Sequence, residues 1–459
     1  MPQASDYRVI LSNFALFLPV HHFPEYWHRL SQPDLWSIGT SINYVKYQHK
    51  QVVDVCIPSA EALLVNPFTI RSTLVFWATE MSVTKGANLM SYLREVDDPR
   101  KPSNGTLHDF VEMLVIAVAA ALSDCDTVED IAYWARAKEA WLRKFLLLTN
   151  GVPSEETFLR VFRVLDPKQF ERAFRRWVGG IVGALSGNIA VDGKTVRGSG
   201  SGNETAIHMV SAFATDLGIV LGQEKVSGKS NEITAIPELL EALYLKGFLV
   251  SIDAMGCQKK IATQITDQGG DYLLAVKGNQ PTLLDAIETE FIDQYQSDDV
   301  DRHRQVHPSH GRIVAQIASV LPAEGIVDLA DWPECKKIAR VDSLRKVGNH
   351  ESKLERRYYI SSRELTAEQL AAAVRAHWGI ENRLHWVLDV SFGEDASTIR
   401  KGNAPQNLSL LKKIVLNLIR LDTADKTKTS LRLKRKCAAW TDDVRMRILG
   451  FTSLGFTSQ

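Results

Sequence analysis

Apolar residues between His377 and Val390 recur at three- and four-residue steps, which predicts an amphipathic helix. The apolar positions of this helix are Trp378, Ile380, Leu384, Val387 and Leu388. Four polar residues, His377, Glu381, His385 and Asp389, follow one another at four-residue steps and so share one side of the helix. Such a stripe is typical of a solvated face, but a carboxylate between two imidazoles also indicates a binding site.

Helical spacing also dominates residues 103–180. It predicts a buried helix at Leu107–Leu122, a helix at Glu155–Leu165 capped by Ser154, and a helix at Phe170–Val178. Several short helices of this kind are compatible with a helix-turn-helix DNA reader and equally with a plain helical bundle.

Short apolar runs replace the helical spacing after residue 186. Ile189–Val191 is followed by Asp192, and Phe248–Ile252 is followed by Asp253, with a turn glycine close behind each acid. Such runs are typical of central strands in a parallel or mixed sheet. The other elements predicted here are strands at Ile207–Ala214, Ile219–Val226 and Tyr272–Val276 and helices at Glu232–Leu245 and Lys259–Asp267.

The interval from Asp253 to Glu381 is about twice as long as the interval from Asp192 to Asp253. Alternating β-like runs occupy its second half, at Ile313–Val320, Lys337–Val341 and Arg356–Ile360. These runs predict an inserted β-rich subdomain between the second and third acid.

Asp192, Asp253 and Glu381 are candidates for one site. Acids at the carboxyl ends of neighbouring strands lie where open α/β sheets bind ligands. Three carboxylates form a hard-oxygen set suited to Mg²⁺ or Mn²⁺. Taken singly, each aspartate is more often a turn former or a helix cap, so the prediction depends on the combination.

The runs that contain these acids are Val-Asp-Gly-Lys-Thr-Val-Arg-Gly, Ile-Asp-Ala-Met-Gly-Cys-Gln and His-Trp-Gly-Ile-Glu-Asn. Further runs lie at residues 230–237, 272–280 and 393–404. In these runs, ordered along roughly residues 88–450, the chain resembles the bacterial insertion-sequence DDE transposases, most closely the H-repeat-associated (ISAs-type) group.

The resemblance implies an α/β fold with a ribonuclease-H-like mixed sheet, preceded by an all-α N-terminal domain. It implies a DNA transposase in which Asp192, Asp253 and Glu381 are the catalytic residues and hold two Mg²⁺ or Mn²⁺ ions for phosphodiester hydrolysis and strand transfer. The implied partner is double-stranded DNA, both transposon ends and target, bound by a homodimer or a larger assembly. Glu394 follows the same pattern and is the alternative third acid, although the helical register favours Glu381.

Several polar residues near the acids are candidate DNA contacts. Those that follow strand ends are Lys194, Arg197, Lys277 and Asn279, which could reach phosphates or be ordinary surface residues. Related transposases often carry a Tyr and an Arg before the glutamate and a Lys after it, where this chain has Val374, His377 and Leu388. The contacts of that motif are therefore expected from His377, Arg383, His385, Arg400 and Lys401.

Composition and charge narrow the class of protein. The chain is 45% apolar and 24% charged, as soluble globular proteins are. Its net charge is zero, yet residues 398–447 hold thirteen Lys or Arg against four Asp, which indicates a phosphate-contacting surface or a solvated helix face. Five cysteines without CxxC spacing indicate a reducing compartment. With no apolar run long enough for a membrane, we expect a cytoplasmic, nucleoid-associated protein.

Residues 1–85 lie outside the resemblance and form an unassigned extension, and Met81 or Met90 is an alternative start. Their histidines, His21, His22 and His28, are expected to form a surface cluster. The expected domains that follow are an all-α DNA-binding domain at 86–185, the catalytic core at 186–300 and 364–425, the β-rich insert at 301–363 and a basic tail at 426–459. Two other functions stay open, an inactive DNA-binding relic of a transposon and a related nuclease without strand transfer.

Overall fold

The computed structural model divides the chain into two compact units, Met1–Glu80 and Met81–Gln459. It describes residues 43–48, 51–56, 89–103, 106–182, 186–202, 205–227, 231–294, 297, 300–309, 312–347, 350–424 and 429–450. In the first unit β1 (Asn43–Gln48) pairs antiparallel with β2 (Gln51–Cys56). The predictions for the three N-terminal histidines and for a start at Met81 lie outside the described residues.

The second unit begins with helices. They are α4 (Leu89–Leu93), α5 (Phe110–Leu122), α6 (Val128–Ala137), α7 (Glu139–Leu142), α8 (Glu155–Val164) and α9 (Pro167–Val182). Asp109 caps α5 by accepting a hydrogen bond from the backbone N–H of Glu112, and Ser154 caps α8 as predicted. Nearly every side chain of α5 is buried, because this helix is apolar on all sides. None of the described helices is long and apolar enough to cross a membrane.

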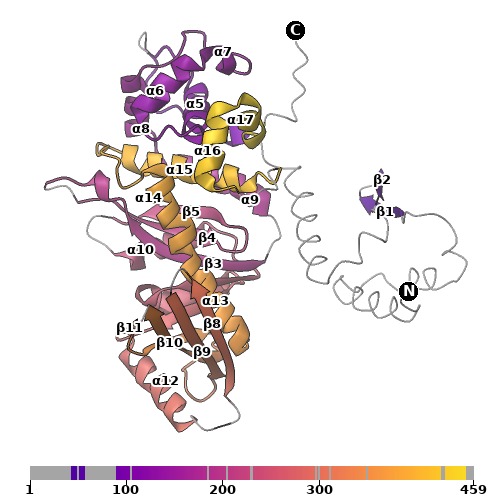
Figure 1. Cartoon of the computed structure of the whole chain (residues 1–459), viewed down its shortest axis with the longest axis vertical. Helices are drawn as coiled ribbons and strands as arrows, with labels where there is room; N and C mark the ends of the chain where they lie inside the picture. The colour runs from indigo at the N-terminus through magenta and orange to yellow at the C-terminus, as the bar shows by residue number, and fades with distance from the viewer. Residues whose placement is uncertain are drawn as a thin grey trace, which may run out of the picture. The chain divides into compact units, whose positions relative to one another are not determined.

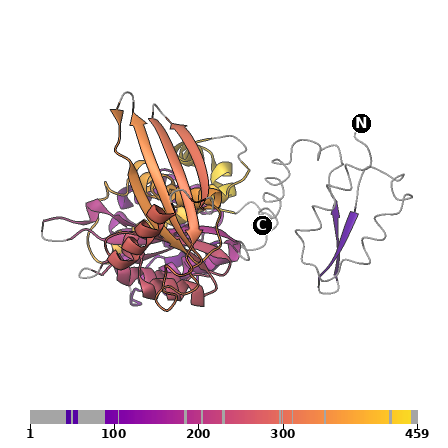
Figure 2. The same ribbon diagram turned by 90° about the horizontal axis from the view of Figure 1, so that it is seen from below.

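A large mixed sheet follows (Figure 1). Its strands lie in the order β5 (Ile219–Lys225), β4 (His208–Ala214), β3 (Gly187–Thr195), β6 (Phe248–Ile252), β7 (Asp271–Val276), β12 (Glu355–Ser361), β10 (Lys337–Val347), β9 (Arg312–Pro322) and β8 (Asp301–Ser309), and β11 (His350–Glu351) pairs with β10. Strands β3, β6 and β7 are parallel, and the other pairs are antiparallel. The protein is therefore mixed α/β. The strands of the expected β-rich insert continue this same sheet, because β12 pairs with β7, and Figure 2 shows them side by side.

Helices cover both faces of the central strands. On one face Leu239 of α10 (Glu232–Glu241) and Ile261 of α11 (Lys259–Asp267) belong to the same core as Val250 of β6. On the other face Leu370 of α13 (Ala367–Ile380) packs with Leu249 of β6 in a separate core. Successive residues of β6 thus point to opposite faces, as the strand geometry requires. Helix α12 (Pro281–Asp293) lies near β10.

A long helical segment crosses the sheet and joins it to the N-terminal helices (Figure 1). It consists of α13, a π-helical turn at Glu381–His385, and α14 (Trp386–Phe392). The buried helix α15 (Ala404–Leu421) follows and contacts α5, α8, α9 and β5. The single amphipathic helix predicted from residues 377–390 is therefore interrupted by a π turn at its glutamate.

The region expected to be a basic tail contains two further helices, α16 (Leu431–Trp440) and α17 (Asp442–Ile448). Two of its arginines, Arg435 and Arg445, are fully buried. The guanidinium of Arg435 pairs with Asp126 at 2.6 Å and donates to the carbonyl of Ala121 at 2.8 Å. Part of the positive charge that predicted a phosphate-contacting surface is thus used inside the protein.

Candidate active site

Asp192 and Asp253 lie next to each other at the carboxyl end of the parallel pair formed by β3 and β6. Strands β3 and β6 are parallel, and Val191 is in register with Ile252. Asp192 follows Val191 and Asp253 follows Ile252, so the two acids are neighbours. Asp253 also caps the short 3-10 turn at Ala254–Gly256, because its carboxylate accepts a hydrogen bond from the backbone N–H of Met255 at 3.1 Å. Asp253 can therefore cap this turn and also belong to the candidate site.

The polar stripe of the long helical segment faces these two strands. His377 Nδ1 lies 3.0 Å from the hydroxyl oxygen of Ser251 on β6, and His385 Nδ1 lies 3.6 Å from Asp192 Oδ2. Glu381 itself is exposed and opens the π-helical turn. Turns of this kind are frequent at functional sites. The alternative of a purely solvated helix face is inconsistent with these contacts.

The acids act on one another electrostatically. The pKa of Asp192 is raised to about 7, mainly by burial. The negative charges of Glu232, Asp253 and Glu381 act in the same direction, and a hydrogen bond from the backbone N–H of Gly193 opposes them. Burial has the opposite effect on the neighbouring imidazole of His385, lowering its pKa to about 4, and Lys413 and Lys194 act in the same direction. His385 is therefore neutral at pH 7.

Glu232 is a fourth acid at this site, to which the sequence had assigned no role. It is the first residue of α10, which Asn231 caps. Its Oε1 lies 2.6 Å from His208 Nε2, and His208 Nδ1 lies 2.9 Å from the hydroxyl of Thr195. It belongs to the run at residues 230–237 that carried part of the family resemblance, and only that run could have drawn attention to it.

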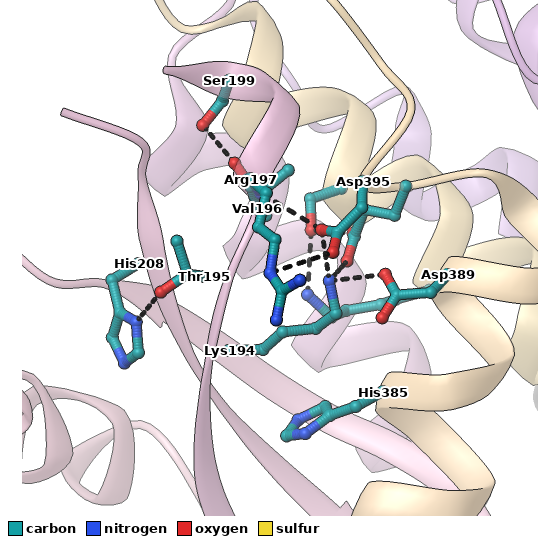
Figure 3. Close-up of polar contacts among 12 residues, drawn as sticks. Lys194, Thr195, Val196, Arg197, Ser199, His208, His385, Asp389 and Asp395 are labelled. Atoms are coloured by element: carbon teal, nitrogen blue, oxygen red, sulfur yellow. Dashed lines mark hydrogen bonds and ion pairs between the residues drawn. The ribbon is translucent and has the colours of Figure 1, made fainter. Parts of the chain in front are cut away.

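Lys194 lies in a cluster of carboxylates (Figure 3). Its Nζ is 2.7 Å from Asp389 Oδ1, 2.9 Å from Asp395 Oδ1 and 3.1 Å from Glu394 Oε2. Its side chain is only 11% exposed. The ammonium group is thus paired with protein carboxylates, which is a different role from the DNA contact expected from the sequence.

The same cluster contains Glu394, the alternative candidate for the third acid. Glu394 is 2% exposed, pairs with Lys194 and accepts a hydrogen bond from the Ser409 hydroxyl at 2.8 Å. Burial would raise its pKa, but the nearby charges of Lys413 and Lys194 hold it below the ordinary value. Its carboxylate is therefore paired inside the protein, whereas Glu381 is exposed beside Asp192.

The other expected DNA contacts fall into two groups. Arg383 donates to the carbonyl of Thr215, Arg400 donates to the carbonyl of Gly200 at 3.0 Å, and the Asn279 amide donates to the carbonyl of Ala254 at 2.7 Å. These three side chains anchor loops near the acids. The side chain of Arg197 is 84% exposed, and Lys277 and Lys401 are also exposed.

The donor set suits a divalent cation by its chemistry, because a bound cation would relieve the repulsion among the carboxylates around Asp192. Among the residues that the structure describes, however, no three His, Cys, Asp or Glu side chains are already arranged as a metal cluster. The side chain of Glu381 is exposed, and its charge acts on Asp192.

Two family profiles match most of the second unit. Residues 185–418 match the family described as "Transposase DDE domain", and residues 90–178 match the one described as "DDE_Tnp_1-associated". The chain therefore belongs to the DDE transposases, and the matched range contains all three predicted acids.

Curated relatives narrow the class to the transposases of bacterial insertion sequences, as the resemblance implied. "Putative transposase YncI" of Escherichia coli O157:H7 is 40% identical over 377 residues, which cover 80% of this chain and 96% of the relative. "H repeat-associated putative transposase YhhI" of Escherichia coli K12 is 39% identical over 361 residues, which cover 76% and 94%. The expected relation to the H-repeat-associated group is thereby confirmed.

Among solved structures, a piggyBac transposase in a synaptic complex with hairpin DNA is similar over 81% of this chain and 78% of that chain. The sequence identity is 9% and the TM-score is 0.37. A TM-score this low does not establish a shared fold.

Proposed function

We propose that this transposase cleaves transposon ends and joins them to target DNA with Asp192, Asp253 and Glu381 as its catalytic acids. The observation that carries the proposal is the position of Asp192 beside Asp253, with the Glu381 charge acting on Asp192. The order of elements supports a ribonuclease-H-like core, since an antiparallel group β3–β4–β5 is followed by α10, β6, α11 and β7. Open α/β sheets bind ligands outside the carboxyl ends of their strands, and Asp192 and Asp253 lie at that end of the parallel pair β3–β6.

Asp192, Asp253 and Glu381 would hold two Mg²⁺ or Mn²⁺ ions, which supply a water of lowered pKa and stabilise the leaving 3′ oxygen. The role of the protein is to supply three ionised carboxylates at one point. Asp192 must lose its proton to hold a cation, and the neutral His385 beside it adds no positive charge that would compete with that cation.

Double-stranded DNA is the proposed substrate, bound as transposon ends and target by a homodimer or larger assembly. The exposed side chains of Arg197, Lys277 and Lys401 are available to contact phosphates. The helices of residues 89–182 are the proposed DNA-reading part. A cytoplasmic, nucleoid-associated location follows from this substrate.

Cleavage and joining of a plasmid that carries the DNA flanking this gene would test the proposal. Metal-dependent nicking at the element ends, followed by joining, is expected for the wild type and for Asp285→Ala, a control acid exposed on α12. Both reactions should be lost in Asp192→Ala and Glu381→Ala. DNA binding without cleavage in the wild type would identify a relic, and cleavage without joining would identify a nuclease.

A further inference from the structure

We propose that Lys194 is a positioning residue that holds the helix bearing Glu381 against the strand bearing Asp192. This inference rests on the proposed function, because it concerns how the same three acids are brought together. Lys194 follows Asp192 by two residues on β3, so both side chains lie on one face of the sheet. Its three carboxylate partners all come from α14 and the turn that follows it.

The partners of Lys194 are continuous with Glu381. Asp389 lies two turns after Glu381 in the same helical segment, and its Oδ1 is 2.7 Å from Lys194 Nζ. Gly393, with a φ of 55°, ends α14 in the left-handed conformation. The chain then turns back, so that Asp395 reaches the same ammonium group as Asp389 (Figure 3). Glu394 also pairs with this group.

Three carboxylates thus lie within 3.1 Å of one ammonium group, and the contact with Asp395 is a hydrogen bond. The network also extends beyond it. Glu394 accepts from Ser409 on α15, and Lys413 Nζ lies 3.0 Å from Ser409 Oγ and 2.5 Å from Gln223 Oε1 on β5. The anchor of α14 is therefore built into the buried part of the second unit, whereas Glu381 at the other end is exposed.

Removing the Lys194 charge would leave three carboxylates close together with reduced compensation. Their repulsion would move α14 away from β3 or favour protonation, and either change would alter where Glu381 lies relative to Asp192. Supports of metal-binding residues typically contribute a factor of about 10–100 to metal affinity. The expected defect is thus in metal affinity and in the cleavage step, with DNA binding preserved.

Lys194→Met tests this in the full chain, with Arg363→Met as the matched control. Arg363 pairs with Asp271 at 2.8 Å at the start of β7. This ion pair lies at the amino end of the parallel strands, and the acids lie at the carboxyl end. Asp389→Asn removes one negative charge from the helix side of the cluster and is the variant to use if Lys194→Met does not fold. Lys194→Arg tests whether a conservative cation restores function. Mn²⁺ binding without DNA, Mg²⁺ dependence of cleavage, DNA affinity and thermal unfolding would be measured for each protein.

We expect Lys194→Met to weaken Mn²⁺ binding about tenfold and to raise the Mg²⁺ needed for half-maximal cleavage by a similar factor, within the range for such supports. Its DNA affinity should stay within about twofold of wild type, and Lys194→Arg should recover part of the loss. Arg363→Met should lower stability without changing the metal dependence.

Unchanged metal dependence in Lys194→Met, or a loss of DNA affinity that accounts for the whole defect, would overturn the positioning role. The proposed function is judged separately. A wild type whose Mn²⁺ binding is lost in Asp192→Ala and weakened in Lys194→Met, but that cuts no DNA, would support the positioning role while refuting the transposition chemistry. Normal transposition by both the wild type and Lys194→Met would support the transposition chemistry and refute the positioning role.

Discussion

At the scale of single residues, the crowding around Asp192 leaves no room for a side chain at Gly193. A Cβ atom at this position would overlap Glu232 Oε1 and His208 Nε2. The two side chains are hydrogen bonded to each other, so they pack over the backbone as one unit. The absence of a side chain at residue 193 is thus what lets Glu232 approach Asp192.

Gly193→Ala should break the contact between His208 and Glu232 and destabilise the protein by about 1–3 kcal/mol, the usual cost of overpacking. Cleavage should fall as well, because the carboxylate of Glu232 is displaced from the acid cluster. Gly179→Ala is the matched control, since a Cβ at this exposed position of α9 meets nothing within 4 Å. It should be neutral or stabilise the helix by up to about 1 kcal/mol. Denaturant unfolding and plasmid cleavage measure both effects.

The raised pKa of Asp192 predicts how the stability of the metal-free protein depends on pH. Between the ordinary value of 3.8 and about 7 the folded protein holds a proton that the unfolded chain releases. The unfolding free energy should therefore fall as pH rises through this range, by at most about 4 kcal/mol. Asp192→Asn should remove this slope, and saturating Mn²⁺ should restore stability to the wild type at pH 7. A metal-free wild type whose stability depends on pH in the same way as that of Asp192→Asn would contradict the prediction.

Residue roles were only partly predictable from sequence. The three acids stand out because each follows an apolar run or lies in a regular helix. Lys194 received a DNA-contact role because sequence shows that it follows Asp192 but not that α14 returns to meet it. Glu232 was missed for the same reason, since its neighbour His208 lies on a strand rather than on its own helix.

At the scale of elements, regular apolar patterns predicted the structure well. Helix α11 has the predicted bounds, Lys259–Asp267, and the β4–β5 hairpin lies within about one residue of its prediction. Strand β8 was not predicted as a strand, because it is the edge strand of the sheet and its polar side chains show no alternation. The π turn at Glu381 was also not predicted, because one extra residue leaves the apolar spacing almost unchanged.

Glu381 lies in the π turn and Glu394 lies just after α14. Substitution of Glu381 should affect metal binding, whereas substitution of Glu394 should affect stability. Glu381→Gln should abolish cleavage and weaken Mn²⁺ binding with little loss of stability, because the side chain is exposed. Glu394→Gln should cost about 3–5 kcal/mol, as breaking a buried ion pair usually does, because it leaves Lys194 and Lys413 with reduced compensation. Unfolding curves and Mn²⁺ titration separate the two. A stable Glu394→Gln without metal binding would instead make Glu394 the third acid.

At the scale of the whole molecule, the C-terminal helices bind the N-terminal helices to the catalytic part. Arg435 on α16 contacts Asp126 and the carbonyl of Ala121 near the end of α5, and its guanidinium lies over the ring of Phe392 at 4.2 Å. One side chain thus links three segments that are far apart in sequence. Charge alone predicted a tail, because a buried arginine interrupts the apolar pattern by which helices are recognised.

Arg435→Met therefore distinguishes a structural helix from a DNA-binding tail. The variant should lose about 3–5 kcal/mol of unfolding free energy, because Asp126 keeps its charge without its main partner. DNA affinity measured well below the melting temperature should stay near that of wild type, since the guanidinium is fully buried. Arg432→Met removes an exposed charge from the same helix and should leave stability unchanged. If Arg435→Met kept its stability and lost DNA affinity, α16 would be a DNA-contacting element. The packing of the N-terminal helices against the sheet would then depend on α15, which contacts α5, α8, α9 and β5.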